Sequence, residues 1–408
     1  MSWEKKPLEQ LGVITSSKRI YKKEYVKSGI PFFRTKEVKE LANGKEIATE
    51  LFISRERYLE ILDKFGVPEE GDILLTAIGT IGEVYVVNNA SPFYFKDGNV
   101  LWLKNFNELS PGYLRYALLS FVDELNALSN GAAYNALPIK KLKQHQVFVP
   151  PKNIQNEIVT VLDKAFADIE QARANTEKNL QNARELFDSY LQQVFSERGD
   201  RDVKGELGDF CYIKHGFAFK SDFFVEKSDY VLLTPGNFYE RGGYRDRGEK
   251  QKYYGGDIPQ EYILDKGALL VAMTEQAVGL LGSAALINSN NRFLHNQRLG
   301  LVKLVDEYEG KIDLEYLFYL FNTSYFRNQV QKTATGLKVR HTSPKKLMKI
   351  EVAIPKSIDT QKKIVRELNF LHSQTVRLED IYTKKLAALD ELKQSLLKQA
   401  FTGQLTQG

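Results

Sequence analysis

Cysteine is almost absent from this chain of 408 residues, which holds Cys211 alone. A single thiol excludes an intramolecular disulfide and a cysteine-based metal cluster. The five histidines stand in unrelated segments without metal-ligand spacing. No apolar run approaches the roughly 20 residues that span a bilayer, and the polar segment 1–6 is unlike a signal peptide. We therefore expect a cytoplasmic protein without a metal site.

The motifs of several enzyme classes are also missing. The sequence has no GxxxxGK phosphate loop, no HExxH zinc motif and no GxSxG nucleophile turn. It lacks the NPPY or DPPY tetrapeptide of amino-methyltransferases, and no glycine-rich strand–loop–helix suggests a nucleotide or S-adenosylmethionine pocket. We expect no catalytic residue and no cofactor bound by this chain.

What the chain does contain is enough apolar sequence for several buried cores. The apolar share is 43% and the charged share 27%, as in ordinary globular proteins. The length predicts two to four domains. The net charge of +5 permits a nucleic-acid partner without requiring one.

The sequence is a repeat of itself. Segment 139–166 matches 344–371, with Gln155 opposite Gln361 at an offset that also takes Phe195 onto Phe401. Upstream, 75–87 resembles 274–287 and 112–120 resembles 315–323. The order is therefore domain, helix, domain, helix, although duplication of any α/β module would give the same pattern.

A long helical pattern follows each half of the repeat. Apolar residues recur at steps of four and three, which is the spacing of a coiled-coil seam. The strongest seam positions are Ile158, Leu162, Ile169, Phe187, Val194, Ile364, Leu368, Leu371, Leu378, Leu389, Leu392 and Leu396. We expect two helices of about 40 residues, or about 60 Å, paired antiparallel with a globular domain at each end. Two alternatives stay open: each helix packs on its own domain, or the seam makes a homodimer.

The globular segments mix strands and helices. Segment 71–87 predicts two strands around a tight turn at Gly79 and Gly82, and 98–104 and 297–304 predict one further strand each. Segments 110–125 and 313–330 predict amphipathic helices, with Ser110 and Asp313 as N-caps.

The predicted class is α+β: two pseudo-symmetric mixed α/β domains separated by an antiparallel two-helix coiled coil. The predicted boundaries are 1–150 for the first domain, 151–200 for the first long helix, 201–356 for the second domain and 357–408 for the second long helix.

Basic windows precede both long helices. No Asp or Glu occurs between Glu124 and Glu157 or between Glu315 and Glu351, although lysines and arginines do. Such windows can lie on phosphates without self-repulsion, while a solvated basic face is the alternative. Arg suits guanine, and Asn or Gln suits adenine. The candidate DNA-binding residues are Lys18, Arg19, Lys22, Arg34, Thr35, Thr76, Thr80, Asn99, Asn130, Tyr134, Lys140, Lys141, Lys214, His215, Lys220, Asn237, Thr274, Gln276, Asn296, Gln297, Arg298, Thr335, Lys338, Arg340, His341, Lys345 and Lys346.

The whole pattern resembles the specificity subunit of type I restriction-modification systems. The resemblance rests on "GIPFFRTKEV" (29–38), "GDILLTAIGTIG" (71–82) and "VFVPPKNIQNEIVTVLD" (147–163). In the second half it rests on "IKHGFAFKSDFF" (213–224), "VAIPKSIDTQKKIVREL" (352–368) and "LLKQAFTGQL" (396–405).

The resemblance implies a non-catalytic chain whose two target-recognition domains each bind one half of a split DNA site. It implies a helical rod that sets the spacing and docks two methyltransferase subunits, which use S-adenosylmethionine. A translocase-nuclease that uses ATP and Mg is a further implied partner. The competing hypotheses are a stand-alone DNA-modifying enzyme and a coiled-coil scaffold that binds only proteins.

Overall fold

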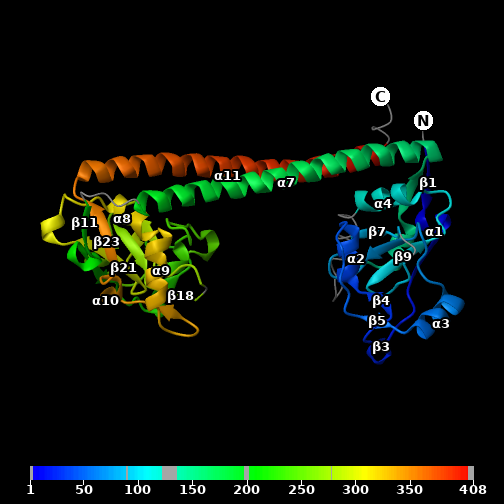
Figure 1. The fold of residues 1–408 in the computed structure, drawn as a ribbon, viewed down its shortest axis with the longest axis horizontal. Coiled ribbons are helices and arrows are strands. Elements are labelled where there is room, and N and C mark those ends of the chain that lie inside the picture. Colours follow the sequence, from blue (N-terminus) through cyan, green and yellow to red (C-terminus); the bar gives the residue numbers. More distant parts are fainter. Residues whose placement is uncertain (1–2, 89–90, 122–135, 197–201, 277, 403–408) are drawn as a thin grey trace. The chain divides into compact units, whose positions relative to one another are not determined.

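The computed structural model describes residues 3–88, 91–121, 136–196, 202–276 and 278–402 (Figure 1). The chain forms two compact units. Unit 1 comprises Met1–Glu177 and Thr383–Gly408, and unit 2 comprises Lys178–Tyr382. Each unit includes part of both long helices, so the predicted four-part division of the chain stays a prediction.

Unit 1 is built on a four-stranded antiparallel sheet in the order β2 (Val13–Ser16), β9 (Val100–Lys104), β6 (Ile73–Thr76), β7 (Val84–Val86). The central strand β6 is buried at every residue, as its continuous run of β-branched and leucine side chains predicts. A second sheet has the order β3 (Tyr25–Val26), β5 (Phe52–Ile53), β4 (Ile30–Phe33), β8 (Tyr94–Phe95). β1 (Glu4–Pro7) pairs separately with β10 (Gln146–Val149).

The shorter helices of unit 1 are α1 (Leu8–Leu11), α2 (Thr35–Ala42), α3 (Arg55–Phe65), α4 (Pro111–Ser120) and α6 (Ile139–Gln144). The predicted N-cap of α4 is confirmed, because the Ser110 hydroxyl accepts a hydrogen bond from the Tyr113 amide at 3.4 Å. Tyr113 and Leu114 of α4 lie in one core with Ile73 of the sheet.

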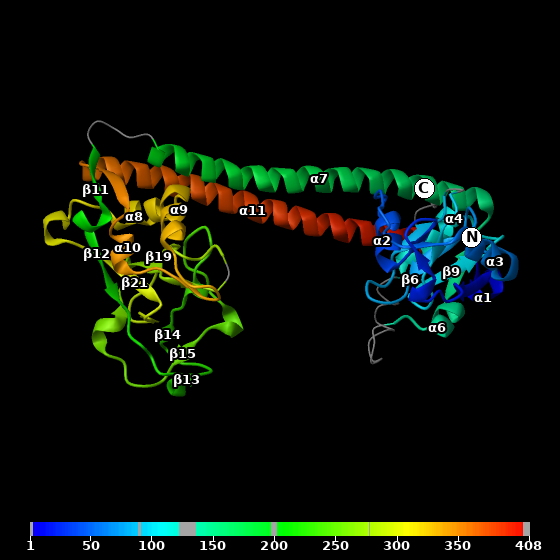
Figure 2. The same cartoon turned by 60° about the horizontal axis from the view of Figure 1, so that its bottom comes forward.

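Unit 2 repeats this architecture. Its four-stranded sheet has the order β12 (Cys211–His215), β21 (Leu299–Leu304), β17 (Leu269–Ala272), β19 (Ala284–Leu286). A five-stranded sheet has the order β13 (Phe224–Val225), β15 (Tyr253–Tyr254), β14 (Val231–Leu232), β20 (Phe293–Leu294), β16 (Ile263–Leu264). β11 (Asp202–Glu206) pairs with β23 (Glu351–Pro355), and β18 (Thr274–Glu275) pairs with β22 (Arg340–His341). In Figure 2 the small strands β13, β14 and β15 lie at the end of unit 2 that is farthest from α11.

The predicted helix over 313–330 is two helices, α8 (Leu314–Phe321) and α9 (Ser324–Thr333). The break has a local cause, because the Thr323 hydroxyl accepts a hydrogen bond from the Phe326 amide at 3.2 Å and so starts a new helix. The predicted N-cap Asp313 is confirmed by its 2.8 Å bond from the Glu315 amide. α10 (Pro344–Leu347) completes the unit. Short 3-10 segments are η1 (Lys22–Glu24), η2 (Leu207–Asp209), η3 (Ser221–Phe223), η4 (Pro235–Asn237), η5 (Gly248–Lys250), η6 (Gln260–Tyr262) and η7 (Asp306–Tyr308).

The long helices are α7 (Lys152–Ser196) and α11 (Ile358–Phe401). Within unit 1, Lys393 Nζ lies 3.0 Å from Glu170 Oε1. Within unit 2, Arg184 Nε lies 2.6 Å from Glu379 Oε1, and the Tyr190 hydroxyl lies 3.2 Å from a Glu367 carboxylate oxygen. In unit 2 the residue numbers rise along α7 as they fall along α11, so the two helices run antiparallel there.

The long helices also belong to the cores of the domains. Ile158 and Leu162 of α7 and Leu397 of α11 share a core with the sheet of unit 1, while Val365 and Leu368 of α11 share the core of unit 2. The alternative that each helix packs on a domain is therefore true alongside the helix–helix pairing. The predicted α+β class with two pseudo-symmetric mixed α/β domains and an antiparallel helix pair is confirmed.

No helix among the described ranges is both long enough and apolar enough to span a lipid bilayer.

Candidate nucleic-acid interface

A buried glutamine near the start of α7 connects three parts of unit 1. Gln155 Oε1 accepts a hydrogen bond from the Ser110 amide at 2.7 Å. Gln155 Nε2 donates to the carbonyls of Glu108 and Pro150, both at 2.8 Å. The amide group thus joins the loop before α4, the end of β10 and the start of α7.

Gln361 makes the equivalent bonds in unit 2. Its Oε1 accepts from the Asp313 amide at 2.8 Å, and its Nε2 donates to the carbonyls of Lys311 at 3.0 Å and Pro355 at 2.8 Å. Both glutamine side chains are fully buried. The repeated motif around Gln155 and Gln361 is therefore a structural joint between each domain and its long helix.

A second repeated contact lies eight residues farther along each long helix, at Asp163 of α7 and Asn369 of α11. The Tyr116 hydroxyl lies 2.5 Å from Asp163 Oδ1, and the Tyr319 hydroxyl lies 2.6 Å from Asn369 Oδ1. Burial raises the pKa of Tyr116 to about 12, with the Asp163 bond adding to the shift, so the phenol stays a donor at neutral pH. These bonds fix α4 on α7 and α8 on α11.

Four segments of unit 1 meet at one end of strands β2, β9 and β6 of its four-stranded sheet. The Ala77 amide donates to the Asn99 carbonyl at 2.9 Å, and the Leu137 amide donates to the Ala77 carbonyl at 2.8 Å. The Gly98 amide donates to the Ser16 hydroxyl at 3.0 Å. We call residues 16–19, 77–80, 97–99 and 136–141 surface 1.

The same four segments meet in unit 2. The Met273 amide donates to the Arg298 carbonyl and the Thr342 amide donates to the Met273 carbonyl, both at 3.0 Å. The Gln297 amide donates to the Phe217 carbonyl, also at 3.0 Å. We call residues 214–217, 273–276, 296–298 and 335–346 surface 2. Arg298 occupies in surface 2 the position that Asn99 occupies in surface 1.

Most of the predicted DNA-binding residues belong to these two surfaces. Surface 1 includes Lys18, Arg19, Thr80, Asn99, Lys140 and Lys141. Surface 2 includes Lys214, His215, Thr274, Gln276, Asn296, Gln297, Arg298, Thr335, Lys338, Arg340, His341, Lys345 and Lys346. The other predicted residues within the described ranges lie outside both surfaces: Lys22, Arg34, Thr35, Thr76, Lys220 and Asn237. Two more, Asn130 and Tyr134, fall outside the described residues. That these residues contact DNA stays a prediction.

Three of the predicted residues are corrected to structural positions, because their side chains are buried and bonded inside the protein. Thr76 is 0% exposed, and its hydroxyl accepts from the Glu83 amide at 3.0 Å. Asn237 is 1% exposed and accepts from the Thr234 amide at 3.0 Å. Asn296 is 8% exposed, and its side-chain oxygen supports its own turn.

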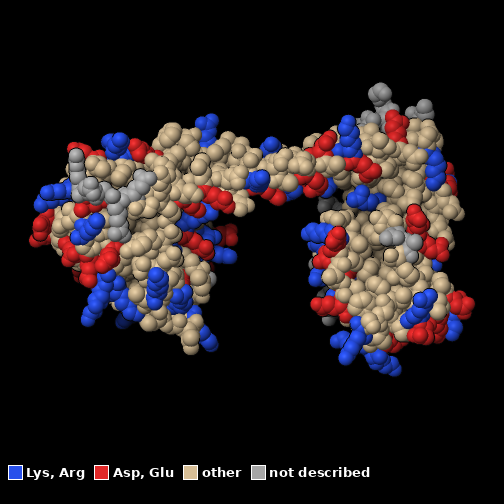
Figure 3. All heavy atoms as spheres, in the orientation of Figure 1, with Lys and Arg blue, Asp and Glu red and all other residues tan. Residues whose placement is uncertain are grey.

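Several of the predicted cations have an acidic neighbour. Arg19 Nε lies 2.7 Å from Asp97, and Lys214 Nζ lies 2.9 Å from Glu261. Such pairs reduce the positive charge available to phosphates, because each acid competes with the incoming anion. Lys and Arg nevertheless gather along the lower edge of unit 2 in Figure 3, over the region of α10 and β18. This edge carries part of surface 2.

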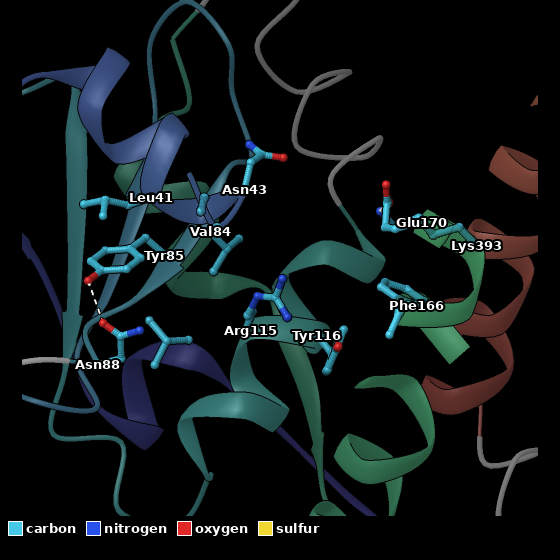
Figure 4. Close-up of a pocket in the computed structure, with 14 residues that line it drawn as sticks. Leu41, Asn43, Val84, Tyr85, Asn88, Arg115, Tyr116, Phe166, Glu170 and Lys393 are labelled. Carbon is cyan, nitrogen blue, oxygen red and sulfur yellow. Dashed lines mark hydrogen bonds and ion pairs between the residues drawn. The ribbon is translucent and has the colours of Figure 1, made fainter. Parts of the chain in front are cut away.

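A groove of about 620 Å³ lies in unit 1 between α2, β7, α4, α7 and α11. Arg115, Glu170 and Lys393 provide charge in its lining, and Figure 4 shows the Tyr85 hydroxyl bonded to Asn88 on another side. A cavity of about 710 Å³ in unit 2 lies between α7, α8, α9 and β23. Within the described ranges, no three His, Cys, Asp or Glu side chains are grouped as metal ligands.

The predicted seam residues of α7 all face inward. Ile158, Leu162 and Ile169 are buried, while Phe187 and Val194 are half-buried. On α11, Leu368 is buried, and the half-buried seam positions are Ile364, Leu371, Leu389 and Leu396.

The seam prediction is wrong for two residues of α11, because Leu378 is 39% exposed and Leu392 is 46% exposed. The neighbouring Glu379 and Lys393 lie toward α7 instead and form ion pairs with it. Strict steps of three and four miss the drift of a helix that has 3.6 residues per turn.

Arg327 belongs to the acid-free window between Glu315 and Glu351, but its side chain is bonded inside unit 2. Burial lowers the pKa of its guanidinium to about 10, and the side chain donates to backbone carbonyls of its own unit. Glu275, a residue of surface 2, is also buried. Sequence patterns gave no signal for either role, because their partners are distant backbone groups.

Comparisons with known proteins agree on one family. The model of the type I restriction modification DNA specificity domain matches residues 1–178 and 202–387. A putative type I restriction enzyme specificity subunit of Haemophilus influenzae is 30% identical over 158 residues, which are 38% of this chain and 38% of that relative. The MjaVIII specificity subunit of Methanocaldococcus jannaschii is 20% identical over 372 residues, covering 86% of this chain and 82% of that one.

Two solved structures share the fold along nearly the whole chain. A chain from a structural study of assembly and conformational transition in the type I R-M system has a TM-score of 0.75, with 14% identity and 98% of both chains covered. The HsdS subunit of Thermoanaerobacter tengcongensis has a TM-score of 0.60 at 15% identity, with 98% of this chain and 97% of that one covered.

The chain belongs to the family of type I restriction-modification DNA specificity domains, and it carries two of them. The prediction of a type I restriction-modification specificity subunit is thereby confirmed, and the two rival hypotheses are not favoured.

Proposed function

We propose that each unit recognises one half of a bipartite site in double-stranded DNA. The main support is that surfaces 1 and 2 are built from the same four segments of the same fold but carry different side chains. Asn99 in surface 1 stands where Arg298 stands in surface 2. Asn suits adenine and Arg suits guanine in the major groove, so the two surfaces suit different base sequences.

The basic residues of each surface supply the part of the affinity that does not depend on sequence. Lys140 and Lys141 in unit 1 correspond to Lys345 and Lys346 at the start of α10. Contacts of this kind with phosphates release counterions, so the affinity falls steeply as the salt concentration rises. They fix the register of the protein on the duplex, and contacts with base edges provide the specificity.

We further propose that α7 and α11 set the distance between the half-sites and dock two methyltransferase subunits. These subunits bind S-adenosylmethionine, and a translocase subunit that joins them uses ATP and Mg. The exposed faces of both helices are rich in charged residues, which suits docking of polar partner surfaces. This chain contributes recognition and geometry, and its partners contribute the chemistry.

The experiment that tests the proposal is methylome sequencing of cells with and without the gene for this chain. We expect one bipartite methyladenine motif to disappear when the gene is deleted and to return with a plasmid copy. An unchanged methylome in cells that hold the partner subunits would refute the proposal. Methylation or cleavage of DNA by the purified chain alone would favour a stand-alone enzyme.

A domain exchange tests which unit recognises which half. When residues 1–150 are replaced by the equivalent segment of another family member, we expect one half of the motif to change and the other half to persist. A change in both halves would contradict independent recognition. A complex that assembles but shows no sequence preference would favour a protein scaffold.

A further inference from the structure

Two segments of surface 2 are joined into one body. Loop 273–282, of which residue 277 lies outside the described residues, stands between β17 and β19. Its start pairs with hairpin 335–341, with Thr274 opposite His341 and Glu275 opposite Arg340. The corresponding loop of unit 1, between Thr76 and Glu83, is shorter and has no acidic residue inside it. Unit 2 therefore has a larger loop structure at the edge that carries the predicted DNA contacts.

Glu275 lies at the centre of this body. Its side chain is 1% exposed. Oε2 accepts hydrogen bonds from the amides of Gly279 at 3.0 Å and Leu281 at 2.8 Å, and Oε1 lies 3.2 Å from Arg340 Nη1. One buried carboxylate thus fixes the backbone of the loop and the side chain of the hairpin together.

Arg327 of α9 holds the other side of the loop. Its guanidinium donates to the carbonyls of Leu281 at 3.1 Å, Glu240 at 2.8 Å and Gly279. Three carbonyl acceptors in different directions match the planar fork of Arg, and the single ammonium of Lys could not reach all of them. The loop is therefore fixed by a cation on one side and an anion on the other.

The tip of the hairpin carries an apolar side chain in solvent. Leu337 is fully exposed, although Lys338 and Arg340 stand beside it. Gly336 precedes it at a φ of +103°, where a Cβ atom would lie 2.1 Å from the Val339 carbonyl oxygen. A tight turn that only glycine allows thus presents an aliphatic side chain within a basic edge.

We propose that loop 273–282 and hairpin 335–341 form one preorganised recognition element, in which Glu275 and Arg327 are positioning residues and Leu337 packs against the bases of the half-site bound by unit 2. Aliphatic side chains contact the methyl group of thymine or insert between base steps in known complexes. Lys338, next to Leu337, suits a phosphate beside such a contact, while Arg340 is held by Glu275 inside the element. The inference rests on the proposed function of unit 2 in DNA recognition.

The first test compares Leu337→Ala with Leu59→Ala, a leucine of α3 in unit 1 that is 50% exposed. Complexes assembled with their methyltransferase subunits methylate a plasmid library in which each position of the motif is randomised. We expect Leu337→Ala to lower methylation of the motif about 10-fold, with altered base preference only in the half bound by unit 2. Leu59→Ala should match the wild type.

Unchanged methylation and unchanged preference with Leu337→Ala would overturn the assignment of Leu337. Weaker assembly of the complex, without a change in base preference, would instead place Leu337 in a contact with a partner protein and also overturn it. A wild-type complex with no bipartite motif would mean that the proposed function itself has failed, so the two failures are distinguishable.

The second test addresses the positioning residues. Arg327→Lys keeps the positive charge but loses most of the carbonyl bonds, and we expect it to relax the base preference in one half of the motif while the other half keeps its preference. Glu275→Gln is the milder variant if Arg327→Lys folds poorly. The matched control is Arg292→Lys, at an exposed position above the Phe293 ring. A loss of thermal stability with unchanged base preference in both test variants would show that the two residues have only a structural role.

Discussion

Replacing Gln155 by Met should destabilise unit 1 far more than its small change in volume suggests. Methionine fills the space of glutamine but makes no hydrogen bonds, so the Ser110 amide and the carbonyls of Glu108 and Pro150 lose their partner. Each buried polar group left without a partner costs about 1–3 kcal/mol. Three such groups give a loss of about 3–9 kcal/mol, because little water reaches a site where Gln155 is 0% exposed.

The two tryptophans allow this loss to be measured in unit 1 alone. Trp3 and Trp102 are the only tryptophans of the chain, and both belong to unit 1. Trp102 is buried and donates to Asp72 at 2.7 Å, so its fluorescence reports the unfolding of unit 1. A local reporter is needed because a chain with two units does not unfold in one step.

The control is Gln399→Met on α11, where the glutamine is exposed and bonds only Ser395 on its own helix. We expect this control to change the free energy of unfolding of unit 1 by less than about 0.5 kcal/mol. The urea midpoint followed by tryptophan fluorescence should therefore change little. If Gln155→Met shifts the midpoint no further than Gln399→Met, the buried amide does not connect α7 to its domain, and the explanation of the repeated glutamine is wrong.

Three further predictions follow from single groups. Burial lowers the pKa of His295 to about 4, so the folded protein favours the neutral ring and loses stability as the pH falls below 6.5. We expect the free energy of unfolding to fall by about 2 kcal/mol between pH 7 and pH 5, and this loss should be absent in His295→Gln. Equal acid sensitivity in both proteins would contradict the prediction. A double-mutant cycle on Arg184 and Glu379 should give about 0.5 kcal/mol that decreases with added salt, because both side chains are partly exposed; a salt-independent coupling would be inconsistent with this. Burial raises the pKa of Cys211 to about 12, so a thiol reagent at pH 8 should modify it only in denaturant, and rapid modification of the native protein would disprove this.

The sequence predicts the architecture well because the fold depends on local patterns that occur twice. The apolar run of β6, the N-cap Ser110 and the 3.5-residue spacing of α7 each follow from neighbours along the chain. Thr323 shows the limit of the same reasoning, since apolar residues resume after the polar triplet 322–324 and favour one continuous helix, whereas α9 begins there.

The candidate interface was harder to predict because its geometry depends on partners that are distant in sequence. Asn237 and Thr76 have the residue types that bind bases, but their burial follows only from how the strands pack. Conversely, Arg327 resembles any other cation of a basic window, and its three acceptors lie 46 to 87 residues away along the chain. A contact of this kind leaves no periodic trace in the sequence.

The contribution of α11 to unit 1 bears on the order of events during biosynthesis. Leu397 and Ala400 are buried in the same core as Tyr113, so this core lacks part of its wall until the ribosome has made the end of α11. At typical elongation rates of about 5–20 residues per second, synthesis from the end of α7 to the end of α11 takes roughly 10–40 seconds. Unit 2 is continuous in sequence and is complete before then. Unit 2, which is synthesised second, is thus the first unit that can finish folding. Until α11 is complete, the apolar residues of unit 1 that pack against Leu397 and Ala400 stay uncovered.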